Sequence, residues 1–487
     1  MTTVESGPVL ASTGGALSFP HGFSWGASTA SYQVEGAATE DGRGRSIWDT
    51  FSHQPGNVRG GDTGDIACDN YHRYPDDIEL MASLGLNAYR FSISWPRVQP
   101  GGRGKPNQKG LDYYRAMLDK LAEHGIAATA TLYHWDLPQE LQDEGGWAVR
   151  DIAERFAEYA SIMAGAIGDR VARWITLNEP QVAANHGYRT GVHAPGLCDD
   201  AAAAAATHHL LLSHGLALRV LRDQLPAGTE VGITLDSHPV QVLGDTQANL
   251  EQARLIVDAN LNGLFLEPLL DGRYPEHAEA RLLPPADLIA DGDLETISQP
   301  IDFLGVNYYG SVYLRAGDQA DPRAHEKRSR MALPSGVVEY LPPDLDRTPM
   351  GWLVDAEGLY EHLLRLAKQA PDLALYITEN GCAAEDYVTP EGAVVDSARI
   401  RYLHEHLHAV ARASRDGANM AGYFVWSLLD NFEWGWGYQK RFGIVFVDFG
   451  TQRRIPKQSA GFYSGIVRAN SVPPLPATWP RWSGHLQ

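Results

Sequence analysis

Short apolar runs alternate with longer mixed stretches along almost the whole chain. Most of these runs are nearly continuous in apolar and aromatic residues, which is typical of parallel strands that are buried on both faces. Eight runs of this kind can be distinguished, and the pattern therefore predicts eight strands. They begin at Phe23, Ala88, Ala127, Arg173, Glu230, Asp302, Leu373 and Gly422.

The stretches between these runs predict helices, clearly so over residues 74–85, 110–125, 147–168 and 356–370. Gly85, Gly125 and Gly168 stand at helix ends, where a left-handed residue is common. Eight alternations of strand and helix predict the α/β class and a single (β/α)8 TIM barrel, with long βα loops at the catalytic face. The alternative is an open doubly wound sheet, but no glycine-rich phosphate loop follows the first strand.

Composition agrees with one large folded unit. The chain has 487 residues, of which 44% are hydrophobic and 21% charged, as expected for a globular protein with a sizeable core. Because (β/α)8 barrels often exceed 250 residues as one domain, we expect a flexible N-terminal tail over residues 1–16 and one barrel domain over residues 17–487.

Charge and cysteine content restrict the partners and the compartment. A formal net charge of −20 repels phosphate backbones and anionic lipids, so we expect no nucleic-acid or membrane partner and a neutral small-molecule substrate. Three scattered cysteines, Cys68, Cys198 and Cys382, do not form a disulfide framework. With no signal-peptide pattern and no long apolar stretch, we expect a cytoplasmic protein. The sequence leaves the oligomeric state open, including a homo-oligomer.

Polar and aromatic residues gather at the carboxyl ends of the predicted strands or in the loops that follow. In a (β/α)8 barrel this end carries the active site, and helix caps or turns would explain only one or two such residues. The set consists of Arg90, His134, Trp135, Asn178, Glu179, Asn307, Tyr309, Glu379, Trp426, Glu433 and Trp434.

Glu179 and Glu379 suggest the chemistry. Cleavage of a glycosidic bond needs one protonated carboxyl for the leaving oxygen and one carboxylate for the oxocarbenium-like centre. The two glutamates lie 379 − 179 = 200 residues apart, yet strands four and seven of a barrel can face each other across its mouth. The nearby tryptophans could stack against the apolar face of a sugar ring.

Several motifs resemble glycoside hydrolase family 1, and in particular its bacterial β-glucosidases. NEP at residues 178–180 and TENG at 378–381 resemble the two catalytic motifs of that family. FSWGASTASYQVEGA, YRFSISWPRVQP, YHWDLPQ, GVNYY and WSLLDNFEWGWGY also match, in order, over almost the whole chain.

This resemblance implies a retaining β-glucosidase that forms a covalent glycosyl-enzyme intermediate. Glu179 would be the acid and base and Glu379 the nucleophile, held ionised by Arg90 and Tyr309. The two carboxyls of such a pair lie only about 5–5.5 Å apart. Repulsion from Glu379 would raise the pKa of Glu179, while Arg90 would lower that of Glu379.

The resemblance also implies substrate contacts. Gln33, His134, Trp434 and Glu433 would hold the outer sugar hydroxyls, and Asn178 would hold the 2-hydroxyl. Glu433 would also repel a phosphorylated sugar. Further substrate-binding residues are Trp135, Asn307, Tyr309, Trp352 on the aglycone side, and Trp426 as the stacking floor.

The expected substrates are β-glucosides and short cello-oligosaccharides such as cellobiose, which would connect the protein with cellulose degradation. The sequence does not separate glucose from galactose or fucose, nor hydrolysis from transglycosylation. Besides a hydrolase and a transglycosidase, the third hypothesis is a non-catalytic sugar-binding relative. The presence of both glutamates disfavours it.

No cofactor or metal is expected. Residues 404–408, HEHLH, formally match the zinc motif H-E-x-x-H, but they lie in a predicted outer helix without an identifiable third ligand.

Overall fold

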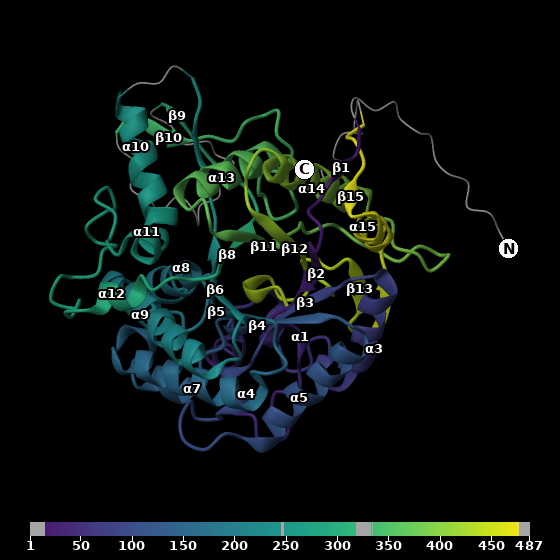
Figure 1. Cartoon of the computed structure of the whole chain (residues 1–487), viewed down its shortest axis with the longest axis horizontal. Helices are drawn as coiled ribbons and strands as arrows, with labels where there is room; N and C mark the ends of the chain where they lie inside the picture. The colour runs from purple at the N-terminus through teal and green to yellow at the C-terminus, as the bar shows by residue number, and fades with distance from the viewer. Residues whose placement is uncertain (1–14, 245–247, 318–332, 334, 477–487) are drawn as a thin grey trace.

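The computed structural model describes residues 15–244, 248–317, 333 and 335–476. Eight parallel strands form a closed barrel, in which the last strand pairs with the first. All eight predicted strands are confirmed (Figure 1). In order around the ring they are β2 (Ser24–Ser28), β3 (Ala88–Ser92), β4 (Ala127–Tyr133), β5 (Arg173–Asn178), β6 (Glu230–Asp236), β8 (Phe303–Tyr308), β11 (Ala374–Asn380) and β12 (Met420–Trp426).

Helices follow each barrel strand and cover the outside of the ring (Figure 1). Their apolar sides pack against strands that are buried along nearly their whole length, which explains the continuous apolar runs of the sequence. The main helices are α3 (Asn70–Leu84), α5 (Gln108–Glu123), α7 (Asp151–Ile167), α9 (Asp200–Gln224), α10 (Ala248–Asp258), α11 (Leu264–Asp271), α13 (Ala356–Gln369), α14 (Ser397–Arg415) and α15 (Gln458–Ala469).

Shorter elements occupy the loops and the ends of the described chain. The strands are β1 (Leu17–Ser18), β7 (Val240–Val242), β9 (Val312–Ala316), β10 (Val337–Glu339), β13 (Val445–Asp448), β14 (Arg453–Pro456) and β15 (Ser471–Val472). The α-helical pieces are α1 (Ser31–Val34), α2 (Ile47–Ser52), α4 (Trp95–Val98), α6 (Gln139–Asp143), α8 (Pro180–Val182) and α12 (Asp293–Ile297). Three 3₁₀ turns are η1 (Arg59–Gly61), η2 (Gly146–Ala148) and η5 (Trp434–Trp436), and two π-helices are η3 (Ala183–Arg189) and η4 (Ala259–Gly263).

The expected left-handed glycines are found at two of three helix ends. Gly85 and Gly125 have φ angles of 81° and 67°, but the prediction for Gly168 is wrong, since its φ is −59°. Glycine is needed at 168 for space instead. A Cβ there would lie 2.3 Å from the Ala164 carbonyl oxygen and 2.7 Å from Leu225 Cδ2.

Most of the predicted tail lies outside the described residues, because the description begins at residue 15. The division into a tail and one domain therefore stays a prediction. Within the described part of the chain, no helix is both long enough and apolar enough to cross a membrane.

Candidate active site

Glu179 and Glu379 lie at the carboxyl end of the barrel and line one cavity of about 400 Å³. Glu379 belongs to β11, whereas Glu179 is the first residue after β5. The backbone of Glu179 is left-handed, with φ 46° and ψ 61°, and its amide donates to the Thr234 carbonyl at 2.9 Å. An unfavourable backbone conformation of this kind is often found at functional residues.

A chain of hydrogen bonds connects the two glutamates. Asn307 Nδ2 donates to Glu179 Oε1 at 2.7 Å and to Asn178 Oδ1 at 3.1 Å. Arg90 Nη2 donates to the same Asn178 oxygen at 2.5 Å, and its Nη1 donates to Glu379 Oε1 at 2.5 Å. Residues from four strands of the ring, β3, β5, β8 and β11, thus fix the relative position of the two carboxyls.

Glu379 is held on both oxygens. Arg90 contacts Oε1, and the Tyr309 hydroxyl donates to Oε2 at 2.8 Å. The Arg90 side chain is 1% exposed and that of Glu379 5%, so this ion pair is shielded from water. The two donors fix the orientation of the Glu379 carboxylate.

Burial raises the pKa of both glutamates. For Glu179 the pKa lies well above the ordinary value, because of burial first, then the charge of Asp236, then that of Glu379. Burial has the largest effect on Glu379 and raises its pKa, although Arg90 lowers it, as predicted, and Tyr309 lowers it as well. Both donors contact Glu379 directly, whereas Arg90 reaches Glu179 only through its charge, so Glu179 is the better proton carrier of the pair.

Three further polar side chains next to this cavity keep unused hydrogen-bonding atoms. Within the described residues, Gln33 Oε1, His134 Nδ1 and Glu433 Oε2 are buried without a hydrogen-bond partner. The Gln33 amide is oriented by its Nε2, which donates to the Phe432 carbonyl at 2.8 Å. Burial raises the pKa of Glu433 to about 8. Buried polar atoms normally find partners, so a ligand rich in hydroxyl groups would satisfy them.

Burial and Arg90 lower the pKa of His134 well below its ordinary value, so its ring is neutral. Its Nε2 lies 3.0 Å from Asn178 Nδ2, which must donate, because Asn178 Oδ1 already accepts two hydrogen bonds. The proton is therefore on Nδ1 of His134, which makes this unpaired atom a donor.

Tryptophans form two walls of the cavity. Trp434 and Trp135 pack with ring centroids 4.6 Å apart, and the indole nitrogen of Trp135 donates to the Asn178 carbonyl at 3.1 Å. Trp426 and Trp352 belong to a separate apolar cluster that also contains Tyr309. Both walls offer aromatic faces for a sugar or its aglycone.

The predicted site residues fall into two groups. Nine line the cavity, namely His134, Trp135, Glu179, Tyr309, Trp352, Glu379, Trp426, Glu433 and Trp434. The other four, Gln33, Arg90, Asn178 and Asn307, are at most 1% exposed and lie behind this lining, where they contact the lining residues or their neighbours.

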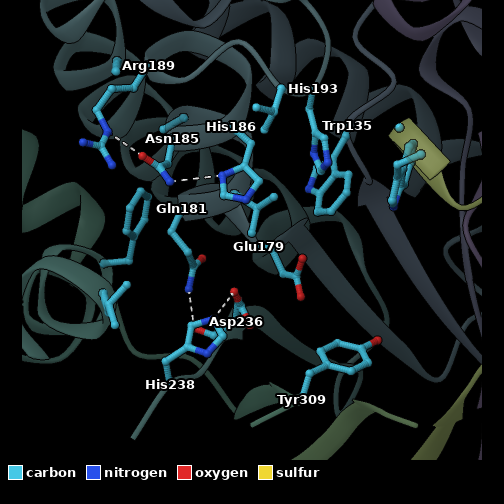
Figure 2. Close-up of a pocket in the computed structure, with 18 of the residues that line it drawn as sticks. Trp135, Glu179, Gln181, Asn185, His186, Arg189, His193, Asp236, His238 and Tyr309 are labelled. Atoms are coloured by element: carbon cyan, nitrogen blue, oxygen red, sulfur yellow. Dashed lines mark hydrogen bonds and ion pairs between the residues drawn. The ribbon is translucent and has the colours of Figure 1, made fainter. Parts of the chain in front are cut away.

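Several cavity residues escaped the sequence analysis. Figure 2 shows a polar wall beside Glu179 that includes Gln181, Asn185, His186, Arg189, Asp236 and His238. Three of them lie on the π-helix η3, whose extra residue per turn gives no recognisable sequence signal. Asp236, by contrast, ends a predicted strand and could have been found by the strand-end criterion.

The histidines of the HEHLH segment lie on α14. His404 Nε2 contacts the Pro473 carbonyl at 2.8 Å, and His406 Nδ1 contacts the Tyr402 carbonyl at 2.8 Å. These contacts give His404 and His406 roles in helix packing.

A (β/α)8 barrel with two buried glutamates at its carboxyl end defines the carboxylate-pair class of glycosidases. Residues 16–472 match the model of glycosyl hydrolase family 1, and the chain belongs to this family.

Relatives and solved structures agree with this assignment. The chain is 49% identical to "Thermostable beta-glucosidase B" of Thermobispora bispora over 96% of this chain and 94% of the relative. It is 45% identical to "Bifunctional beta-D-glucosidase/beta-D-fucosidase" of Bifidobacterium breve over 93% and 99%, respectively. A family 1 β-glucosidase from Thermotoga maritima, solved in complex with isofagomine lactam, superposes with a TM-score of 0.86 at 44% identity, covering 94% of this chain and all of that one.

Proposed function

We propose that this protein is a retaining β-glucosidase that removes terminal non-reducing β-D-glucosyl residues from β-glucosides and short oligosaccharides such as cellobiose. The observation that carries the proposal is the hydrogen-bond chain from Glu179 through Asn307, Asn178 and Arg90 to Glu379. Arg90 of this chain and Tyr309 together give Glu379 two donors, whereas Glu179 lies in surroundings that favour its protonated form.

In the first step Glu379 attacks the anomeric carbon while Glu179 gives its proton to the glycosidic oxygen, which releases the aglycone. In the second step Glu179, now a carboxylate, takes a proton from water, and this water displaces Glu379. The negative charge of Glu379 disappears in the intermediate, which removes one cause of the raised pKa of Glu179 and suits it to act as a base.

The glucosyl unit would be held by the unpaired polar atoms. His134 Nδ1 would donate to a sugar hydroxyl, whereas Gln33 Oε1 and Glu433 Oε2 would accept. Asn178 would hold the 2-hydroxyl, with Asn307 beside it. A buried acid at position 433 supplies no positive charge to balance a phosphate group, which also disfavours a phosphorylated sugar.

Aromatic side chains would complete the substrate site. Trp426 would form the stacking floor under the glucosyl unit, beside Trp434 and Trp135. Trp352, whose ring centroid lies 5.2 Å from that of Tyr309, would flank the aglycone. Indole and phenol rings offer the apolar faces on which sugars and aryl groups stack.

The cysteines and the net charge also bear on the compartment and the partners of the protein. Cys68, Cys198 and Cys382 are all free thiols, which supports a cytoplasmic enzyme. There it would act on cello-oligosaccharides as a late step of cellulose degradation. The net charge of −20 supports the absence of nucleic-acid partners. A homo-oligomer remains compatible with all of this.

The test is kcat/KM on 4-nitrophenyl β-D-glucoside, β-D-galactoside and β-D-fucoside, and on cellobiose, with Glu379→Ala as the inactive control. We expect the glucoside and cellobiose to be hydrolysed and the variant to lose turnover. A preference for galactoside or fucoside would replace the proposed specificity. If the main reaction were glucosyl transfer to an added alcohol, the protein would be a transglycosidase. If it bound glucose without turning over any substrate, it would be a sugar-binding relative.

A further inference from the structure

A third carboxylate, Asp236, faces the same part of the cavity as Glu179. It ends β6, which lies between β5 and β8 in the barrel. It is in register with Asn307, whose amide donates to Glu179. Both Asp236 and Glu179 line the cavity, and Figure 2 shows the two side chains directed toward the same space.

Neighbouring residues fix Asp236 in this position. Its carboxylate Oδ2 lies 2.7 Å from His238 Nε2, and its carbonyl accepts a hydrogen bond of 2.7 Å from Gln181 Nε2. His238 is held in turn, because Asn262 accepts from its amide at 3.0 Å and donates to its carbonyl at 2.8 Å. The other ring nitrogen of His238 faces the Gly310 carbonyl at 3.4 Å.

This arrangement favours an ionised Asp236. His238 Nε2 faces Asp236 Oδ2, so its N–H can donate to this carboxylate. A hydrogen bond donated to a carboxylate stabilises its charged form. Asp236 can therefore carry a negative charge while it remains partly buried beside the catalytic acid.

We propose that Asp236 is a positioning residue of the reaction, whose fixed negative charge keeps the proton on Glu179 until the leaving group takes it, with His238 holding the Asp236 carboxylate in place. The inference rests on the proposed function and deepens it. A carboxylate disfavours a second negative charge nearby. Unlike Glu379, Asp236 keeps its charge throughout the catalytic cycle.

The charges around Glu179 agree with this role. After burial, Asp236 is the largest contributor to the raised pKa of Glu179, ahead of Glu379, while Arg90 opposes both. Further titratable groups reach the cavity from other elements: His134 after β4, His186 and Arg189 on η3, Tyr309 after β8, Glu339 on β10 and Glu433 after β12.

The experiment compares the pH dependence of kcat/KM for wild type, Asp236→Asn and His238→Gln on 4-nitrophenyl β-D-glucoside. The basic limb of this profile reports loss of the proton from the catalytic acid of the free enzyme. Asp236→Asn removes the repelling charge, so the pKa of Glu179 falls and the basic limb moves about 1 pH unit toward lower pH. His238→Gln keeps the charge of Asp236 and a side chain that can donate to it, so the limb stays in place.

Asp169→Asn is the matched control. It removes one negative charge from a side chain that is 78% exposed, just after α7 and at the opposite end of the barrel from the cavity. We expect its profile to coincide with that of wild type. Thermal unfolding of all variants identifies any that fail to fold.

A different readout separates this inference from the proposed function. The infrared difference between wild type and Glu179→Gln follows the Glu179 carboxyl during a pH titration without any turnover, and the same difference is taken in the Asp236→Asn background. An unmoved Glu179 titration, or equal shifts in the same direction for both the Asp236 and His238 variants, would overturn the role of Asp236. A wild type that turns over no glycoside would contradict only the proposed function.

Discussion

At the scale of single residues, the site depends on how its surroundings give two chemically identical side chains, Glu179 and Glu379, different tendencies to hold a proton. Glu379 receives Arg90 on one oxygen and Tyr309 on the other. Glu179 receives one neutral amide donor, from Asn307, and faces two other carboxyls. Charge-assisted donors favour an ionised carboxyl, whereas burial near like charges favours a protonated one. The surroundings therefore support Glu379 as the proposed nucleophile and Glu179 as the proposed acid.

This assignment predicts a leaving-group effect for Glu179→Gln. Because glutamine cannot donate the proton, kcat/KM should fall about 10²–10⁴-fold for substrates with poor leaving groups, such as cellobiose. 2,4-Dinitrophenyl β-D-glucoside needs no proton to leave, so its glycosylation step should be affected far less. Steady-state kinetics on both substrates checks this. An equal loss on both would mean that Glu179 acts in some other way.

At the scale of the elements, the barrel was predictable because the parallel strands are buried on both faces, which leaves continuous apolar runs. The small sheet β10–β9–β7 and the π-helix η3 were not predicted. The strands of this sheet are short, and the sequence of η3 does not distinguish it from an α-helix. Asn185, His186 and Arg189 of η3 line the cavity, so part of its wall was missed with this element.

The junction between β11 and β12 gives a prediction about packing. A Cβ on Gly381 would lie 1.9 Å from the Trp426 carbonyl oxygen, so Gly381→Ala must separate these strand ends. We expect a loss of about 1–3 kcal/mol in the free energy of unfolding and a lower kcat, because Glu379 and Trp426 are displaced. Urea denaturation and steady-state kinetics measure the two effects.

Gly465 provides the matched control for this substitution. It is an exposed position inside α15, and an added Cβ would meet no neighbouring heavy atom within 4 Å. Gly465→Ala should therefore leave kcat unchanged and stabilise the protein by up to about 1 kcal/mol. Equal stability of the two variants would show that the approach of Gly381 to Trp426 is not restrictive.

At the scale of the whole molecule, the site is assembled from strand ends all around the barrel. The sequence identified which residues gather there, since carboxyl ends of parallel strands share one face of the ring. It did not reveal that Gln33 and Asn178 lie behind the cavity lining, or that burial outweighs Arg90 in setting the pKa of Glu379. Both depend on how closely side chains from separate parts of the chain pack at the carboxyl end of the barrel.

The proposed mechanism requires Glu379 to form a covalent bond with the sugar. Incubation with 2,4-dinitrophenyl 2-deoxy-2-fluoro-β-D-glucoside, followed by mass spectrometry of the intact protein and its peptides, tests this most directly. The fluorine slows release of the intermediate, and the dinitrophenolate leaves without a proton. We predict the addition of one fluoroglucosyl group, located on Glu379 in the peptide that contains TENG. Rapid turnover without a labelled protein, or a label on another residue, would contradict the account.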